Sequence, residues 1–391
     1  MNFAEFLAPM AVDSFMAEHF GRRPAHIWGE SPRAALLSTR RLEELLTVRP
    51  HWTEDNLKLI LNSRPIIGDL YFERAEAGHK VRRADSAKVE LFLRMGASLV
   101  GDQIEDVDPV VRDAAAMLSE RFAATTGANV YCSFKGIRAF NSHCDLHEVF
   151  AVQLEGEKVW QIYENRAEAP IEAIEGPNAQ AMIDQAKGRV LMTVHMRPGD
   201  LLYIPRGFFH DALASSDASL HLTFGVAPLN GRYALRLLEE QAIKSASVRS
   251  YLPDGRTEPE ALRQHLDGLA EEMAALVRSP MFAALMTSRQ RATVMTANAA
   301  DLRDRAKLDH FAATGQQAEV AWRPEGAVLH HPRGDEPLGL FGEAVEWILG
   351  QQAFSKQQLQ AQFGWLTEAE AQQVIGLVTR TGLFASFEPR V

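Results

Sequence analysis

Cysteine is scarce in this sequence, and its scarcity excludes two classes of protein. Cys132 and Cys144 are the two cysteines of the chain, too few for a disulfide framework or a cysteine-rich zinc module. No stretch approaches the ~18 uninterrupted apolar residues of a membrane-spanning helix. The first segment lacks a basic region and carries Glu5 and Asp13 inside its apolar stretch, which argues against an ordinary signal peptide. We therefore expect a cytoplasmic protein without a membrane partner.

Positive charge is also in short supply. The 391 residues contain 41 Lys and Arg against 51 Asp and Glu, which gives a net charge of −10. Proteins bind nucleic acids and anionic membranes largely by neutralising phosphate charge. The charge balance therefore argues against those partners and favours a basic protein or peptide. Glycine and proline supply 26 and 18 residues, too few for a collagen-like or low-complexity chain.

The first two thirds of the sequence change from a helical to a strand pattern near residue 128. Apolar spacing predicts helices at 1–25, 40–48, 54–63 and 108–126. Short β-branched and aromatic runs bounded by glycine then predict six strands of an antiparallel barrel or sandwich. These strands are expected at 129–134, 149–154, 158–163, 189–195, 201–205 and 220–227, with a polar, partly helical insertion at 164–188.

After Pro228 the strand pattern stops. Amphipathic helices are expected at 231–248, 258–277 and 283–306, followed by a proline- and glycine-containing linker near 322–338. The last segment predicts helices at about 340–350, 355–362 and 367–382 and a strand at 383–387, which is the outline of a winged helix. From Pro337 onward three basic residues face five acidic ones, so we expect this winged helix to have a structural or protein-docking role and not to bind DNA.

One short motif in the barrel region has the spacing of a metal site. His143 and Asp145 are two residues apart, and residues at that spacing face the same side of a strand. His210 follows a later strand and offers a third ligand, with His195 and His221 as alternatives. Two histidines and one carboxylate leave coordination positions open, as in non-haem Fe(II) oxygenases. The motif alone is weak, because His265-Leu266-Asp267 repeats it in a predicted helix.

Longer strings carry a family resemblance. The segments HCDLHEVFAVQLEGEKVWQIY (143–163), RPGDLLYIPRGFFHDA (197–212) and SLHLTFGV (219–226) resemble JmjC-type Fe(II)/2-oxoglutarate oxygenases, and most closely the ribosomal oxygenase branch. The resemblance implies an α+β protein with a double-stranded β-helix, of the jelly-roll or cupin type. It also implies a catalytic domain at 1–228, a helical dimerisation domain at 229–328 and a winged-helix domain at 329–391, and hence a homodimer.

The resemblance also implies roles for individual residues. His143, Asp145 and His210 match the iron ligands, and Lys158 matches the basic residue that binds the distal carboxylate of the cosubstrate 2-oxoglutarate. A lysine in an apolar strand is costly to bury without such a partner, although a strand-edge lysine after a hairpin turn is the plainer interpretation. Further cosubstrate or substrate contacts are implied at positions that a simple strand would also explain, namely Asn129, Tyr131 and Thr223.

The resemblance implies hydroxylation of an arginine or histidine side chain in a ribosomal protein. The turn Lys135–Arg138 departs from the family pattern, so the substrate is open. Alternative targets are a natural-product peptide, a tRNA or another protein, and a different class of function is a non-catalytic cupin used as an interaction module. Cys144 is expected to face away from the metal, and His147 shares the parity of the ligands without a role in the family.

Overall fold

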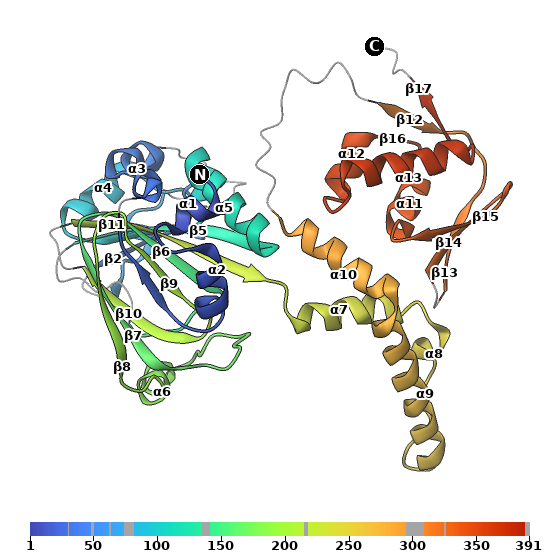
Figure 1. The fold of residues 1–391 in the computed structure, drawn as a ribbon, viewed down its shortest axis with the longest axis horizontal. Helices are drawn as coiled ribbons and strands as arrows, with labels where there is room; N and C mark the ends of the chain where they lie inside the picture. Colours follow the sequence, from blue (N-terminus) through green and yellow to red (C-terminus); the bar gives the residue numbers. More distant parts are fainter. Residues whose placement is uncertain are drawn as a thin grey trace. The chain divides into compact units, whose positions relative to one another are not determined.

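The computed structural model describes residues 1–29, 31–47, 51–61, 64–73, 82–134, 141–214, 218–294, 309–323 and 326–387. Within them the chain forms two compact units, the first comprising Met1–Pro228 and the second beginning at Leu229. Among the described helices, none has the length and apolar character needed to cross a membrane. Each unit is described by itself below (Figure 1).

The first unit is built on two antiparallel sheets. The larger has eight strands in the order β1-β9-β6-β11-β5-β4-β2-β3, and the smaller has the order β10-β7-β8. The strands of the larger sheet are β1 (Ala25–Ile27), β2 (Leu57–Leu61), β3 (Arg64–Pro65), β4 (Ser98–Gly101), β5 (Ala124–Phe134), β6 (Glu148–Glu155), β9 (Leu201–Ile204) and β11 (Ala218–Pro228). Those of the smaller sheet are β7 (Lys158–Arg166), β8 (Val190–Met196) and β10 (Phe208–Ala214).

Alternation along the central strands divides the core into two layers. On β6, Val149 and Ala151 face the smaller sheet and pack with Trp160 and Ile162 of β7. Phe150, the residue between them, faces the opposite side and joins the larger core under the N-terminal helices. Period-two alternation in a buried strand produces this division. The face of β6 toward the smaller sheet is therefore the one available to a site between the sheets.

Helices cover the outer face of the larger sheet (Figure 1). A buried guanidinium, that of Arg33, ties the N-terminal segment to the barrel by donating to the backbone carbonyls of Phe6, Ala8, Ile27 and Gly199. Burial lowers the pKa of Arg33 to about 10, although nearby Asp200 opposes the shift.

The helices of the first unit are α1 (Phe3–Leu7), α2 (Val12–Ser14), α3 (Thr39–Leu46), α4 (Ser86–Arg94) and α5 (Pro109–Phe122), with α6 (Ala179–Ala186) in the insertion after β7.

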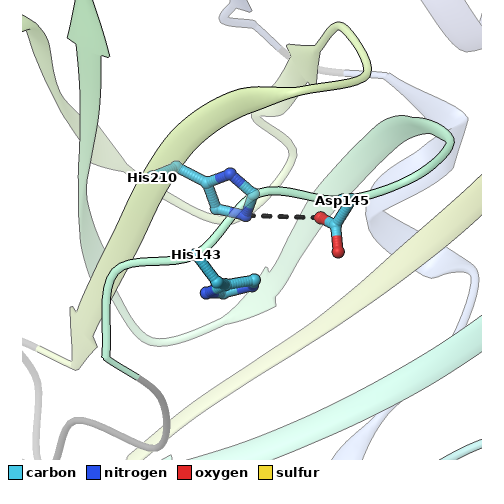
Figure 2. Close-up of side chains that lie close together, drawn as sticks. All are labelled: His143, Asp145 and His210. Atoms are coloured by element: carbon cyan, nitrogen blue, oxygen red, sulfur yellow. Dashed lines mark ion pairs between the residues drawn. The ribbon is translucent and has the colours of Figure 1, made fainter. Parts of the chain in front are cut away.

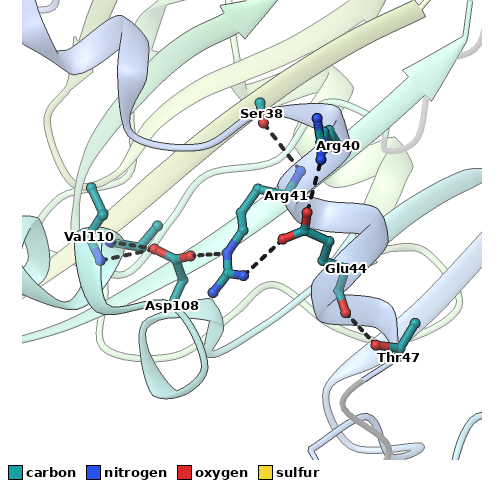
Figure 3. A network of polar contacts seen from close by, with 8 residues as sticks. Ser38, Arg40, Arg41, Glu44, Thr47, Asp108 and Val110 are labelled. Carbon is teal, nitrogen blue, oxygen red and sulfur yellow. Dashed lines mark hydrogen bonds and ion pairs between the residues drawn. The ribbon is translucent and has the colours of Figure 1, made fainter.

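A charged network joins α3 to the start of α5 (Figure 3). Asp108 is the N-cap of α5 and accepts hydrogen bonds from the backbone amides of Val110 and Val111 at 3.0 and 3.1 Å. Its other carboxylate oxygen accepts from Arg41 Nε of α3 at 2.9 Å. Arg41 also contacts Glu44 one turn along its own helix. The network fixes two covering helices relative to each other on the outer face of the larger sheet.

Several predicted elements of the first unit are wrong. The expected helix at 1–25 is interrupted: α1 ends at Leu7, and the chain passes through a cis Ala8–Pro9 bond before α2 begins. The helix expected at 54–63 is strand β2, because Leu57 and Leu59 alternate with the exposed Lys58 and pair with β4. Strand β10, which carries His210, is not among the six expected strands.

The second unit combines helices with two small sheets. Its helices are α7 (Gly231–Ala242), α8 (Ala246–Arg249), α9 (Pro259–Arg278), α10 (Pro280–Ala292), α11 (Gly342–Leu349), α12 (Lys356–Gln362) and α13 (Glu368–Arg380). One sheet has the order β16-β12-β17, and the other has the order β13-β14-β15. These strands are β12 (His310–Ala313), β13 (Glu319–Arg323), β14 (Gly326–His331), β15 (Gly334–Gly339), β16 (Ala353–Ser355) and β17 (Phe384–Phe387).

The segment 322–338, expected to be a linker, is instead largely the antiparallel sheet β13-β14-β15. Pro332 lies in the turn between β14 and β15, and Gly334 has a φ of 129° that an L side chain rarely adopts. Pro337 lies on β15, an edge strand of the described sheet, where proline is tolerated. The helix expected at 283–306 corresponds to α10, which ends at Ala292. Residues 295–308 fall outside the described residues.

Candidate metal centre

A cavity of about 310 Å³ lies between the two sheets of the first unit. All seven residues that the sequence singled out as site residues line this cavity. They come from both sheets and from the segment before β6. The lining residues are Thr125, Gly127, Asn129, Tyr131, His143, Asp145, His147, Val149, Lys158, Trp160, His210, Ala212, His221, Thr223, Gly225 and Ala227.

Three of these residues form a metal-ligand set (Figure 2). One ligand atom from each of His143, Asp145 and His210 can be chosen so that all lie within 4.8 Å of one another. His210 Nε2 lies 3.4 Å from Asp145 Oδ2. No other group of three or more such side chains was found among the described residues. The spacing suits a single cation bound by two imidazoles and one carboxylate.

The backbone brings the two histidines together. The amide of His143 donates to the carbonyl of His210 at 3.0 Å, and the amide of His210 donates to the carbonyl of His143 at 2.9 Å. This isolated antiparallel bridge places the two rings with centroids 4.5 Å apart. Residues distant in sequence therefore meet through backbone pairing.

Each histidine ring is also oriented by a backbone carbonyl. His143 Nδ1 lies 2.9 Å from the carbonyl oxygen of Asn141, and His210 Nδ1 lies 3.0 Å from that of Phe208. A proton on Nδ1 satisfies each contact and leaves Nε2 as the ligand, the usual arrangement for metal-binding histidines. Burial, followed by the adjacent His143, lowers the pKa of His210 to about 4, so the ring is neutral at pH 7. Burial opposes ionisation of Asp145, yet His210 and His143 hold its pKa below the usual value.

A second layer of hydrogen bonds supports the ligand segments. Asp211, which follows His210 and is buried, accepts hydrogen bonds from Ser142 Oγ and Tyr163 OH, both at 2.7 Å. Lys187 Nζ in turn contacts Ser142 Oγ at 3.1 Å and lies over the Tyr163 ring. The hydrogen bond from Ser142 to Asp211 therefore ties the residue before His143 to the residue after His210.

Lys158 is a buried cation in the same cavity. Its side chain belongs to a residue that is only 4% exposed, and no carboxylate among the described residues forms an ion pair with it. Its Nζ lies 3.4 Å from His221 Nδ1 and about 6 Å from the centroids of the Tyr131 and Trp160 rings. Burial lowers the pKa of Lys158 to about 7. An anion entering the cavity would relieve the cost of burying this charge.

One wall of the cavity comes from the paired strands β5 and β11. Asn129 is opposite Thr223, and Tyr131 is opposite His221, so all four side chains share the inner face. Thr223 Oγ1 is buried and has no hydrogen-bond partner within the described part of the chain, and the same is true of Trp160 Nε1. Unsatisfied buried polar atoms in a cavity indicate a ligand or water that completes them. The cavity therefore offers three ligands to a metal ion. It also offers the Lys158 ammonium and two free polar atoms to a small anionic molecule.

The structure separates the alternatives that the sequence left open. His195 is exposed on β8, opposite Val159, and does not line the cavity. His221 lines the cavity but does not belong to the ligand group. His265 and Asp267 lie on helix α9, where no metal group is found among the described residues.

Other neighbours of the ligands have defined places. Cys144 packs beside Tyr163 and Phe209, away from the metal-ligand group. His147 does line the cavity, and its ring lies where a Cβ on Gly225 would fall, 2.8 Å from its Cε1. Sequence reasoning missed Trp160 and Gly225, although strand parity with Lys158 and Thr223 was enough to find them. The turn Lys135–Arg138 lies outside the described residues.

Known proteins share this domain. The JmjC domain family matches residues 104–233. Ribosomal oxygenase 1 of Gallus gallus is 32% identical over 225 residues, which cover 56% of this chain and 36% of that protein. The bifunctional lysine-specific demethylase and histidyl-hydroxylase NO66 of Culex quinquefasciatus is 30% identical over 259 residues, 65% of this chain and 38% of that protein. The chain therefore spans less than two fifths of the length of these two relatives.

Solved structures extend the likeness to nearly the whole fold. YcfD, a ribosomal oxygenase from Escherichia coli in complex with cobalt and 2-oxoglutarate, aligns over 97% of this chain and 99% of its own, with a TM-score of 0.51 and 14% sequence identity. At that identity the likeness concerns the fold, which is of the JmjC/cupin type. Residues 104–233 of this chain thus form a JmjC domain, and the homologues of the chain include the ribosomal oxygenases.

Proposed function

We propose that this protein is an Fe(II)- and 2-oxoglutarate-dependent hydroxylase that acts on a protein side chain. The observation that carries the proposal is that one cavity holds three metal ligands and a buried lysine for which the described residues supply no carboxylate. A non-catalytic cupin module would not need a buried cation without a counter-ion. When bound, Fe(II) and 2-oxoglutarate would supply the oxidising chemistry with O2 as the oxidant: one oxygen atom would convert a C–H bond to C–OH, and the other would enter succinate as 2-oxoglutarate loses CO2.

The residues of the chain have distinct tasks in this proposal. His143, Asp145 and His210 hold the metal and leave coordination positions open for other ligands. Lys158 binds the distal carboxylate of 2-oxoglutarate, and Asn129, Tyr131 and Thr223 supply polar contacts along the cavity wall. The apolar residues around the cavity exclude water, which strengthens the attraction between Lys158 and a carboxylate.

A ribosomal protein is the proposed substrate class, with an arginine or histidine as the hydroxylated residue. The names of the relatives support this choice. The charge of the chain supports it too, because ribosomal proteins are strongly basic and a net charge of −10 would attract them. A natural-product peptide, a tRNA or another protein are the alternative targets, of which the tRNA fits the acidic chain least.

Two measurements test the proposal. The purified protein with Fe(II) should convert 2-oxoglutarate to succinate, at least slowly, without a prime substrate. Ribosomal proteins from cells with and without the gene should then differ by 16 Da on one peptide. No turnover would leave the non-catalytic alternative, whereas turnover with an unchanged ribosomal mass pattern would redirect the search to the other targets.

We also propose assignments for the second unit. The order α11-β16-α12-α13-β17, with β12 between β16 and β17, supports a winged helix at 329–391. The helices α7 to α10 support a helical dimerisation domain at 229–328, because apolar residues such as Leu235, Ile243 and Leu266 are exposed on them. Light scattering should then give the mass of a homodimer. The acidic charge of the last segment disfavours DNA as its partner, and a cytoplasmic location remains our expectation.

A further inference from the structure

His221 is the buried cavity residue that the proposed metal centre does not use. It lies on β11 and is only 2% exposed. Its ring stacks on Tyr131, with centroids 4.6 Å apart and an interplanar angle of 9°, and meets the Trp160 ring edge-on at 5.6 Å. Two aromatic side chains therefore fix the plane of the imidazole.

This fixed ring presents Nδ1 to Lys158. The distance from Lys158 Nζ to His221 Nδ1 is 3.4 Å. An ammonium group is a donor of three hydrogen bonds with no acceptor, so Nδ1 must be the acceptor in this contact when Lys158 is charged. The imidazole proton then resides on Nε2. Burial and the neighbouring Lys158 lower the pKa of His221 far below its ordinary value, which keeps the ring neutral and able to accept.

A single oriented hydrogen bond matters because the Lys158 side chain has four rotatable methylenes. Its contacts with the Tyr131 and Trp160 rings attract the ammonium without directing its N–H groups. With one N–H directed to His221, the other two are confined to a cone that opens toward the cavity. Such pre-organisation favours binding of an anion because less freedom is lost when it binds.

We infer that His221 is a positioning residue for Lys158: its Nδ1 fixes the ammonium so that it receives the distal carboxylate of a dicarboxylic 2-oxo acid. The inference rests on the proposed function and deepens it. His221 neither binds the metal nor reaches the reacting atoms. Hydrogen bonds to charged groups are worth enough that the loss of this one should weaken carboxylate binding by roughly 10- to 100-fold.

The test compares His221→Phe with His221→Asn in the full-length protein loaded with Fe(II) under anaerobic conditions. Phenylalanine keeps a ring against Tyr131 but removes the acceptor. Asparagine keeps an acceptor at the δ position and loses the ring. The dissociation constant of 2-oxoglutarate is measured by the absorbance change on binding, alongside the Fe(II) affinity and the Tm of each variant. The control ligand is 2-oxopentanoate, which has the same chain length but no distal carboxylate.

We expect His221→Phe to weaken 2-oxoglutarate binding roughly 10- to 100-fold, with unchanged affinity for Fe(II) and for 2-oxopentanoate, and His221→Asn to recover most of the loss. The inference is overturned if His221→Phe binds 2-oxoglutarate like the wild type. It is overturned equally if both variants weaken the two ligands alike, since that outcome shows a packing role. If the wild type itself binds no 2-oxoglutarate, the proposed function fails first.

A measurement on the unmodified protein covers the case in which neither variant folds. Nitrogen-15 NMR of the histidine rings distinguishes a protonated from an unprotonated Nδ1. With 2-oxoglutarate bound, His221 should have its proton on Nε2 and a bare Nδ1. A proton on Nδ1 would contradict the inference, because that nitrogen could not then accept from Lys158.

Discussion

Replacement of Lys158 by methionine should stabilise the empty protein while destroying its affinity for 2-oxoglutarate. Burial lowers the pKa of Lys158 from 10.5 to about 7. At about 1.36 kcal/mol per pH unit, a lowering of that size corresponds to roughly 4 kcal/mol of folding free energy at neutral pH. Methionine has a similar length and carries no charge, so the variant escapes most of that cost.

The same charge is what a bound carboxylate needs. If one partner of a buried ion pair is removed, the other is left uncompensated at a cost of about 3–5 kcal/mol. The dissociation constant of 2-oxoglutarate should therefore rise by between about 100- and 5,000-fold in Lys158→Met. Metal affinity should be unchanged, because Lys158 does not belong to the ligand group. Stability and cosubstrate affinity should move in opposite directions.

The pH dependence gives this prediction a sign that can be checked. Between about pH 7 and pH 10 the unfolded chain holds the Lys158 proton more tightly than the folded chain does. The stability of the empty wild-type protein should thus gain a contribution from Lys158 as pH rises through this window. Chemical denaturation of both proteins at pH 7 and pH 9.5 should show Lys158→Met to be more stable at pH 7, with the difference shrinking at pH 9.5. A methionine variant less stable than wild type at pH 7 would refute the reasoning, since it would mean that Lys158 already has a counter-ion.

Three further changes probe other parts of the first unit. His143→Ala should remove one of three ligands, so Fe(II) affinity measured by calorimetry should fall by at least about 100-fold and 2-oxoglutarate turnover should cease; unchanged turnover would exclude this ligand set. Asp211→Ala leaves the hydroxyls of Ser142 and Tyr163 without their acceptor, so the free energy of unfolding should fall by about 2–5 kcal/mol, with the single-donor variant Ser142→Ala losing less. Arg33→Met leaves four backbone carbonyls without their guanidinium donor, so the Tm should fall by on the order of 10 °C, with metal affinity retained in the folded protein. A Tm unchanged within about 2 °C would show that those carbonyls find other donors.

The residues that the sequence singled out as site residues line one cavity, whereas several elements of the surrounding fold were predicted wrongly. The resemblance to JmjC-type oxygenases pointed to Asn129, Tyr131, Lys158 and Thr223, whereas strand parity relates only residues of one strand, such as Asn129 and Tyr131. The third ligand was harder, because His195, His210 and His221 all lie on strands. Only the pairing of β10 with the segment around His143 distinguishes among them, and that pairing is a long-range contact.

The errors arose where tertiary contacts override local preference. The run at 54–63 has apolar residues at spacings that fit either a helix or a strand, and pairing with β4 decides in favour of the strand. The prolines and glycines at 322–338 predict a linker, but such residues are equally suited to turns and to an edge strand. The break in the first helix at Pro9 could have been foreseen, because proline ends a helix at the preceding residue.

The paired backbone hydrogen bonds between His143 and His210 have a consequence for metal supply. Since main-chain pairing sets the spacing of these two ligands, that spacing is not tailored to one ion. Divalent metals that accept two nitrogens and one oxygen then compete by concentration and intrinsic affinity, and Cu(II), Ni(II) and Zn(II) bind such ligands more tightly than Fe(II) does. Protein produced in iron-poor medium should therefore carry other divalent metals in place of iron.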